Sequence, residues 1–455
     1  MTNQPLEARQ QIVSSLLKAD ALQSDHEAAQ ERGFDMMDVG RARCPASATH
    51  PLVATAGLVA FLTTVAALCL FQTWPRENIS NSALTAILVT ACAIYLADIV
   101  LARVHLRPST GIDYAYDDPS LARTGCKLVG LTASLGFVGA IYWLAPEYHG
   151  AFYDPFYDML RTLMPIWLLL APPYFYFVDR HMRKPHDGYW HLGQAVLLRF
   201  DKSDQGIVVQ HLLGWLVKGF FLPLMFVYFC NGLDRLLSLD TQSLTSFPLW
   251  YDFLFEFVFF IDVGLASMGY LLALRVTDTH LRSAEPTVLG WLVAVICYEP
   301  FVSLISLHYL AYSGGLVWGD WLADKPALSG LWGVTILMLV TVYAWSTVMF
   351  GARFSNLTHR GIITNGPYRW TRHPAYVAKN LSWWMISIPF ISQGSPSEAV
   401  RHCLLLLGLN VIYCLRAKTE EHHLNRDPVY REYSRYIHEH GIFRFLRFAS
   451  FRRST

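Results

Sequence analysis

Residues 361–384 read GIITNGPYRWTRHPAYVAKNLSWW, and this stretch crosses from a polar, basic loop into an apolar segment. It gathers two arginines, a histidine and two tyrosines into a few turns of chain: Tyr368, Arg369, Arg372, His373 and Tyr376. Guanidinium groups bind carboxylates and phosphates through fixed pairs of donors, and aromatic rings stack on flat ligands. The stretch therefore predicts a site for an anionic, planar ligand at the border between a polar and an apolar region.

The rest of the chain is typical of an all-α, polytopic integral membrane protein. Of its 455 residues, 53% are hydrophobic and 16% are charged, whereas about 25% are charged in soluble domains. Apolar runs of about 20 residues, enough to cross a bilayer as a helix, recur from residue 51 onward. We expect a helical bundle with about ten spans, near residues 51–73, 83–104, 127–146, 160–179, 207–229, 249–275, 287–312, 330–350, 376–394 and 399–416.

The cationic residues of the loops predict the orientation of the chain. One set of alternate loops carries fifteen cations and the other carries five, and Lys and Arg are retained on the cytoplasmic side. Both termini are therefore predicted to be cytoplasmic, and residues 1–50, which lack the apolar stretch of a signal peptide, are expected to form a polar cytoplasmic tail. The fifteen are Arg103, Arg107, Arg123, Lys127, Arg180, Arg183, Lys184, Arg199, Lys202, Arg275, Arg282, Arg353, Arg360, Arg369 and Arg372; the five are Arg76, Arg161, Arg235, Lys325 and Arg401.

Several ionisable residues fall inside the predicted spans, where they form internal pairs or mark functional cavities. Lys218 is expected to pair with Glu256 or Asp262, which would hold helices together. Glu299 is more suggestive of function, because the following Pro300 frees a backbone carbonyl and can open a cavity. At the cytoplasmic edge, Arg353, Arg360 and Trp370 are interpreted as membrane anchors.

The chain shows no pattern typical of a metal site or of a nucleic-acid partner. No two of its eight cysteines have zinc-like spacing, and the histidines of the loop at 180–206 do not share one helical face. The net charge of +1 gives no indication of nucleic-acid binding. Membrane lipids are the expected partners, and the oligomeric state is left open.

Four short motifs near the carboxyl end carry a resemblance to a known family. GPYRWTRHPAY, at residues 366–376, precedes the last two predicted spans, which the short turn ISQGSPSE joins into a hairpin. Arg416, the pair Glu420 and Glu421, Leu424, and then Tyr430 with Tyr433 follow the hairpin. Over roughly residues 350–445 this order resembles the isoprenylcysteine carboxyl methyltransferase and phospholipid methyltransferase superfamily.

The resemblance implies a membrane methyltransferase that uses S-adenosylmethionine. Cationic side chains suit the carboxylate of this cofactor, carboxylates suit its amino and hydroxyl groups, and aromatic faces suit its adenine and sulfonium. Pro374 fixes the backbone where the loop turns into the helix. The candidate cofactor-binding residues are therefore Tyr368, Arg369, Arg372, His373, Pro374, Tyr376, Glu420, Glu421, Tyr430 and Tyr433, and the candidate catalytic residues are Arg416 and Glu421.

The methyl acceptor is expected to be a lipid or isoprenoid-like amphiphile, methylated on oxygen or nitrogen. The family often has glycine where this chain has Ala378, which indicates a different depth of the ligand against the helix. Candidate substrate-binding residues are Lys379, Asn380, Trp383, Trp384 and Glu299. In this interpretation residues 51–276 form an amino-terminal membrane bundle of about six helices, and residues 277–455 form a methyltransferase-like membrane domain with a cytoplasmic cofactor site.

Two other classes of function stay open. A sterol or isoprenoid double-bond reductase that uses NADPH has a similar ten-span build and a related hairpin, although its Cys-x-x-Lys-Tyr-Gly signature is absent from HHLNRDPVY. A transporter or scaffold without enzymatic activity is the second alternative. The absence of an inverted repeat between the two halves of the sequence argues against a transporter.

Overall fold

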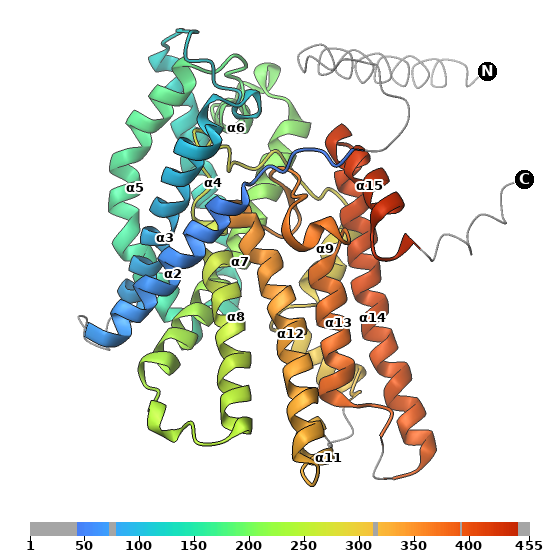
Figure 1. The fold of residues 1–455 in the computed structure, drawn as a ribbon. Helices are drawn as coiled ribbons and strands as arrows, with labels where there is room; N and C mark the ends of the chain where they lie inside the picture. Colours follow the sequence, from blue (N-terminus) through green and yellow to red (C-terminus); the bar gives the residue numbers. More distant parts are fainter. Residues whose placement is uncertain (1–42, 72–78, 313–316, 392–393, 445–455) are drawn as a thin grey trace, which may run out of the picture. The chain divides into compact units, whose positions relative to one another are not determined.

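Long apolar helices make up most of this computed structural model, which describes residues 43–71, 79–312, 317–391 and 394–444 (Figure 1). Most of the predicted tail at 1–50 lies outside the described residues. The α-helices are α2 (Pro51–Phe71), α3 (Ile79–Ala102), α4 (Leu121–Leu144), α5 (Asp154–Arg180), α6 (Gly188–Val196), α7 (Gln205–Leu237), α8 (Phe247–Leu271), α9 (Val288–Val295), α10 (Phe301–Ser303), α11 (Trp318–Trp321), α12 (Pro326–Phe350), α13 (Pro374–Ser387), α14 (Pro396–Leu424) and α15 (Pro428–His440). Two short strands, β1 (Ser283–Ala284) and β2 (Thr358–His359), pair antiparallel.

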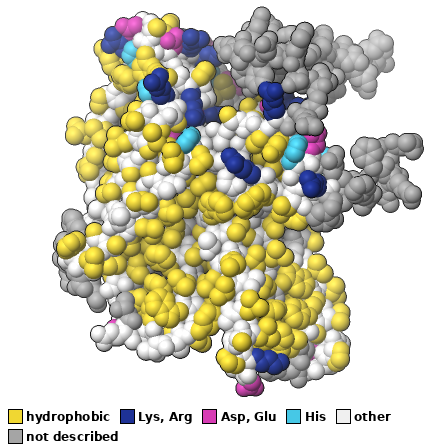
Figure 2. Space-filling model, viewed as in Figure 1, with side chains coloured by type: hydrophobic (Ala, Val, Ile, Leu, Met, Phe, Trp, Pro, Cys, Tyr) yellow, Lys and Arg dark blue, Asp and Glu magenta, His cyan; other side chains and the backbone are white. Residues whose placement is uncertain are grey.

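Helix length and composition agree with an integral membrane protein. Among the described residues, seven helices are long and apolar enough to cross a bilayer: α2, α3, α4, α7, α8, α12 and α14. Figure 2 shows hydrophobic side chains over the middle of the visible face, with most Lys, Arg and His side chains toward the end where α6 and α15 lie. The count of about ten spans is not confirmed, because three of the predicted spans differ from this pattern.

The three differing spans are interrupted, short or rich in proline. The predicted span at 287–312 is broken into α9, α10 and a π-helical turn at Leu304–Tyr309. Helix α13 has 14 residues, a rise of about 21 Å against the roughly 30 Å of a hydrocarbon core. Helix α5 contains three internal prolines and nevertheless continues to Arg180.

Aromatic side chains fill the core of the amino-terminal helices. Phe61 of α2, Phe229 of α7 and Phe260 of α8 meet with ring centroids 5.0 to 5.7 Å apart. Gly264 of α8 lies against the same rings, and a Cβ there would come within 2.7 Å of Phe61. The same core continues into α12 and the loop after it, through Val348, Met349 and Ile363. The predicted boundary at residue 276, between an amino-terminal membrane bundle and a methyltransferase-like domain, stays a prediction.

The basic residues interpreted as membrane anchors include two that are buried. Arg353 and Arg360 are 1% and 3% exposed, so their interpretation as anchors was wrong. The Arg353 guanidinium pairs with Asp98 of α3 at 3.2 Å and lies 3.8 Å from Asp278. Arg360 donates to the backbone carbonyls of Gly269, Leu272, Thr279 and Phe354, and it thereby closes the carboxyl end of α8.

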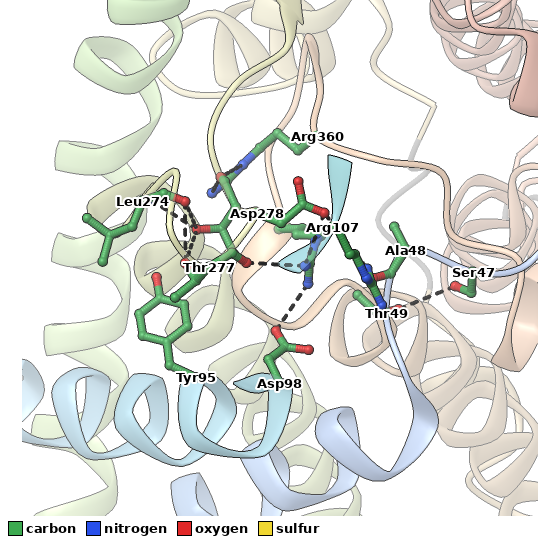
Figure 3. Close-up of polar contacts among 12 residues, drawn as sticks. Ser47, Ala48, Thr49, Tyr95, Asp98, Arg107, Leu274, Thr277, Asp278 and Arg360 are labelled. Atoms are coloured by element: carbon green, nitrogen blue, oxygen red, sulfur yellow. Dashed lines mark hydrogen bonds and ion pairs between the residues drawn. The ribbon is translucent and has the colours of Figure 1, made fainter. Parts of the chain in front are cut away.

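These groups form one buried charge cluster where α3, the loop after α8 and the loop after α12 meet. In Figure 3, Asp98, Arg107, Asp278 and Arg360 converge from separate segments of the chain. Arg107 and Arg282 lie 3.8 Å and 3.2 Å from Asp278. These charged groups pair with one another inside the protein, because a buried charge without a partner is energetically costly. Lys218, by contrast, does not pair with Glu256 or Asp262 as predicted: it lies over the Trp215 ring, and Glu256 pairs with Arg235.

An extended strap at residues 45–49 ties the start of α2 to the loop that precedes α13. Ala48 N donates to the Ile362 carbonyl at 2.8 Å, and Thr364 Oγ1 donates to the Pro45 carbonyl at 2.9 Å. The Asn365 side-chain amide donates to the Thr49 carbonyl at 2.9 Å. The strap thus fixes the backbone directly before the GPYR motif.

Candidate functional site

A pocket opens between the turn after α9, the end of α12, the loop at 354–358, and helices α13 and α14. The space free of protein atoms between these elements is about 990 Å³, a figure that includes open solvent. The carboxyl end of α12, the start of α13 and the carboxyl end of α14 line it together, and Figure 1 shows these three helices side by side. The two halves of the predicted site, separated by a hairpin in the sequence, therefore meet in one cavity.

The polar mouth of the pocket is built from the RHPAY segment and α14. Pro374 is the first residue of α13, and His373 precedes it, so the helix begins inside the motif. The Tyr376 hydroxyl donates to Glu420 at 2.8 Å, and the His373 ring stacks on the Tyr376 ring at 5.3 Å. Both tyrosine and carboxylate face the cavity together with Arg372.

Glu421 lies behind this mouth as an anionic hub. One carboxylate oxygen lies 3.1 Å from His373 Nε2 and 3.2 Å from the Arg372 guanidinium, and the other lies 2.9 Å from Lys418 Nζ. Glu421 is 8% exposed and does not line the pocket. These contacts position Arg372 and His373. The predicted catalytic role of Glu421 would require it to face the cavity, and it does not line it.

Arg416 lies earlier on α14 than Glu421, about two turns before His423. Its guanidinium donates to the Asn356 side-chain oxygen at 2.7 Å and to the Tyr298 hydroxyl at 3.3 Å. It also lies over the Tyr376 ring at 5.2 Å. Arg416 is 7% exposed, lines the cavity, and makes no ion pair within the described residues. A buried cation with only neutral partners can accept an anionic group from a ligand.

Helix α15 clamps the GPYR loop from outside. The Tyr433 hydroxyl donates to the backbone carbonyls of Tyr368 at 2.7 Å and Thr371 at 3.3 Å, and Arg372 donates to Ser434 at 3.1 Å. Burial raises the pKa of Tyr433 and of Tyr430, so both phenols stay neutral and Tyr433 remains a donor. Neither tyrosine lines the pocket, whereas Tyr368 does. Tyr430 and Tyr433, which were predicted to contact the cofactor, therefore do not belong to the cavity wall.

The remaining predicted residues divide between the cavity and its support. Lys379 lines the pocket, whereas Arg369 is exposed and lies outside the lining. Asn380 and Trp384 both hydrogen-bond to Asn410, which joins α13 to α14. The other two candidates for the substrate also lie outside the lining: Trp383 packs on Tyr413 with centroids 5.1 Å apart, and Glu299 pairs with Ser303.

Several pocket residues carry no signal in the sequence. Tyr298 stands beside the predicted Glu299, and Glu285 and Asn356 come from polar loops. His423 follows the Glu-Glu motif, two residues after Glu421, and is the one that helical spacing could have suggested. It lies one turn beyond Glu420 on the same face of α14.

Comparison with known proteins agrees with the motifs. The model of the isoprenylcysteine carboxyl methyltransferase (ICMT) family matches residues 330–426, from α12 to the end of α14. No curated protein and no solved structure matches the chain. Glu285 and Tyr298 lie outside the matched range, so the cavity includes residues that the match does not cover. The resemblance predicted from the motifs is confirmed for the carboxyl-terminal region: residues 330–426 of this integral membrane protein match the ICMT family.

Proposed function

We propose that this protein transfers a methyl group from S-adenosylmethionine to a lipid-like amphiphile at the cytoplasmic edge of the membrane. The observation that carries the proposal is the polar mouth of the pocket. There Tyr376 holds Glu420, and Glu421 holds Arg372 and His373, all inside the region that matches the family.

The donor set of the cavity fits this cofactor. Its carboxylate needs fixed cationic donors, which Arg372 and Arg416 offer, and its ammonium and ribose hydroxyls need a carboxylate, which Glu420 offers. Aromatic faces suit adenine and sulfonium, and Tyr298, Tyr368 and Tyr376 line the same space.

The chemistry supplied by S-adenosylmethionine is a methyl group on a cationic sulfur, which becomes a neutral thioether as the acceptor atom bonds the methyl carbon. The protein side chains bind and orient the reactants, since alignment at contact distance provides much of the acceleration. Phe350, Phe354 and Tyr413 give part of the cavity wall an aromatic, apolar surface. An acceptor with an apolar chain suits this wall better than a soluble metabolite does.

Calorimetry on the full chain in detergent tests the cofactor. S-adenosylmethionine should bind the wild type, and Glu420→Gln should weaken binding on the order of tenfold, because a charge-assisted hydrogen bond is lost. Glu256→Gln is the matched control, since Glu256 is 61% exposed and pairs with Arg235 outside the pocket. Binding of NADPH without binding of S-adenosylmethionine would sink the proposal in favour of a reductase.

The acceptor is tested by mass spectrometry of lipid extracts from cells with and without the protein. A methyl-sized mass difference in one amphiphile, lost in Arg416→Met, is the expected result. If cofactor binds but no lipid changes mass, the acceptor belongs to another class.

A further inference from the structure

Lys379 lies at the inner end of the pocket, deeper along α13 than the polar mouth. It is the sixth residue of the helix, about 7.5 Å along the axis from Pro374. Its ammonium lies over three aromatic rings: Trp383 at 5.3 Å, Tyr343 at 5.5 Å and Tyr413 at 5.6 Å. Aromatic faces attract a cation but accept no strong hydrogen bond from it.

This ammonium makes no ion pair within the described residues. Asp262 of α8, whose charge acts on Lys379, accepts hydrogen bonds from Tyr343 at 2.9 Å and from Thr347 at 2.5 Å and forms no ion pair with the lysine. Lys379 Nζ itself makes neither a hydrogen bond nor an ion pair with the described part of the chain. Three charged N–H donors therefore remain available on a side chain that lines the cavity.

Lys379 shares the cavity wall with a second cation that has no ion pair within the described residues. Arg416 is the other cation of this wall, and its partners are the neutral Asn356 and Tyr298. The one acidic group of α14 in the lining, Glu420, lies at the mouth and is bound by Tyr376. A cation inside a membrane protein is costly unless it meets an anion, a polar partner or water. Two cationic side chains, Lys379 and Arg416, thus line this part of the cavity, and neither makes an ion pair with the described residues.

From this juxtaposition we propose that Lys379 is the specificity-determining contact for the acceptor, and that it binds an anionic oxygen group, a carboxylate or a phosphate, on an amphiphile. The contact holds the acceptor whichever of its atoms is methylated. The inference rests on the proposed methyltransferase function, because only that function makes the bound amphiphile a methyl acceptor. Binding of the amphiphile to Lys379 does not itself require the cofactor. Lys218 lacks these features: it lies over a single ring and outside the pocket.

Binding to the wild-type protein tests the charge requirement without any substitution. We would measure native mass spectra in a neutral detergent with palmitate, methyl palmitate, hexadecyl phosphate, hexadecanol and inorganic phosphate. The charged amphiphiles should bind on the order of 10- to 100-fold more tightly than the neutral ones, as expected for a charge-assisted contact. Equal binding of palmitate and methyl palmitate would overturn the proposal. Binding of inorganic phosphate as tight as that of hexadecyl phosphate would overturn its amphiphile part.

Variants then assign the contact to one side chain. Lys379→Met should remove the preference for palmitate over its methyl ester, Lys379→Arg should keep it, and the matched control Lys218→Met should behave as wild type. Retention of the preference in Lys379→Met would overturn the assignment, and if that variant fails to fold, the comparison of acid and ester on the wild type still decides. Calorimetry with S-adenosylmethionine on the same samples separates the two proposals. A wild-type protein that does not bind S-adenosylmethionine refutes the methyltransferase, whereas a wild-type protein that binds the cofactor but does not prefer palmitate over methyl palmitate refutes the role of Lys379.

Discussion

Removing Arg353 should destabilise the protein strongly, although this residue lies outside the pocket. Its guanidinium joins Asp98 at 3.2 Å and also donates to the Thr277 carbonyl at 3.3 Å. Asp278 would keep its pairs with Arg107 and Arg282 in the variant Arg353→Met. Asp98, which is fully buried, would keep no ion pair with the described residues.

The magnitude follows from the uncompensated carboxylate. Breaking a buried pair by removing one partner costs about 3–5 kcal/mol. Neutralising the carboxylate as well, in Arg353→Met with Asp98→Asn, should recover part of this loss, and the coupling free energy between the two sites should be about 0.5–3 kcal/mol. Arg235→Met is the matched control, because its pair with Glu256 is 65% and 61% exposed, and it should cost at most about 1 kcal/mol.

The assay is unfolding of the purified protein in mixed micelles with increasing sodium dodecyl sulfate, followed by tryptophan fluorescence. Single, double and control variants are compared at the same protein and lipid concentrations. The reasoning would be refuted if the free energy of unfolding of Arg353→Met lay within about 0.5 kcal/mol of the wild-type value, or if the effects of the two substitutions were fully additive in the double variant. Either result would favour the original interpretation of Arg353 as a membrane anchor.

Three further predictions concern the site and its frame. Glu421→Gln should weaken S-adenosylmethionine binding on the order of tenfold by calorimetry, because the carboxylate that orients Arg372 and His373 loses its charge. Lys418→Met, whose side chain is 62% exposed, should change the affinity little, and the reverse ranking of the two variants would contradict the role of Glu421. Tyr433→Phe should lower the free energy of unfolding by about 1–3 kcal/mol, since the carbonyls of the GPYR loop lose a buried donor, and unchanged stability with unchanged cofactor affinity would argue against the clamp. Burial and four nearby arginines lower the pKa of His280 far below its usual 6.5, so the unfolded chain takes up a proton first as pH falls below about 6.5. Stability should therefore be full above that pH and fall on acidification, and His280→Gln should flatten this dependence in a series of melting temperatures; equal slopes would contradict it.

The features that could be predicted from the sequence are those encoded in local patterns. The GPYR and RHPAY motifs, the hairpin and the Glu-Glu pair are short and ordered, and the hairpin itself brings residue 376 back to residue 420. Helix start at Pro374 follows from the fixed φ of proline. The membrane class follows from apolar runs, which need no tertiary information.

The rest depends on contacts between distant residues. A basic side chain after an apolar run has the composition of an anchor, and only the position of Asp98, 255 residues away, makes Arg353 internal. Likewise, apolar composition does not distinguish a continuous span from the broken one at 287–312. Tyr298 lies in that break and lines the cavity, so neither the break nor this part of the site could be predicted from composition.

The strap at residues 45–49 has a consequence for modularity. It completes the loop before the GPYR motif from a point more than three hundred residues earlier in the chain, through hydrogen bonds of Thr49 and Pro45 to that loop. The region that matches the family is therefore not an independent structural module. Without residues 45–49 of the chain, it would lose the hydrogen-bond partners that hold the loop before the GPYR motif. A substitution at residues 45–49 would therefore act on the conformation of the loop before the GPYR motif, although it lies more than three hundred residues away in the sequence.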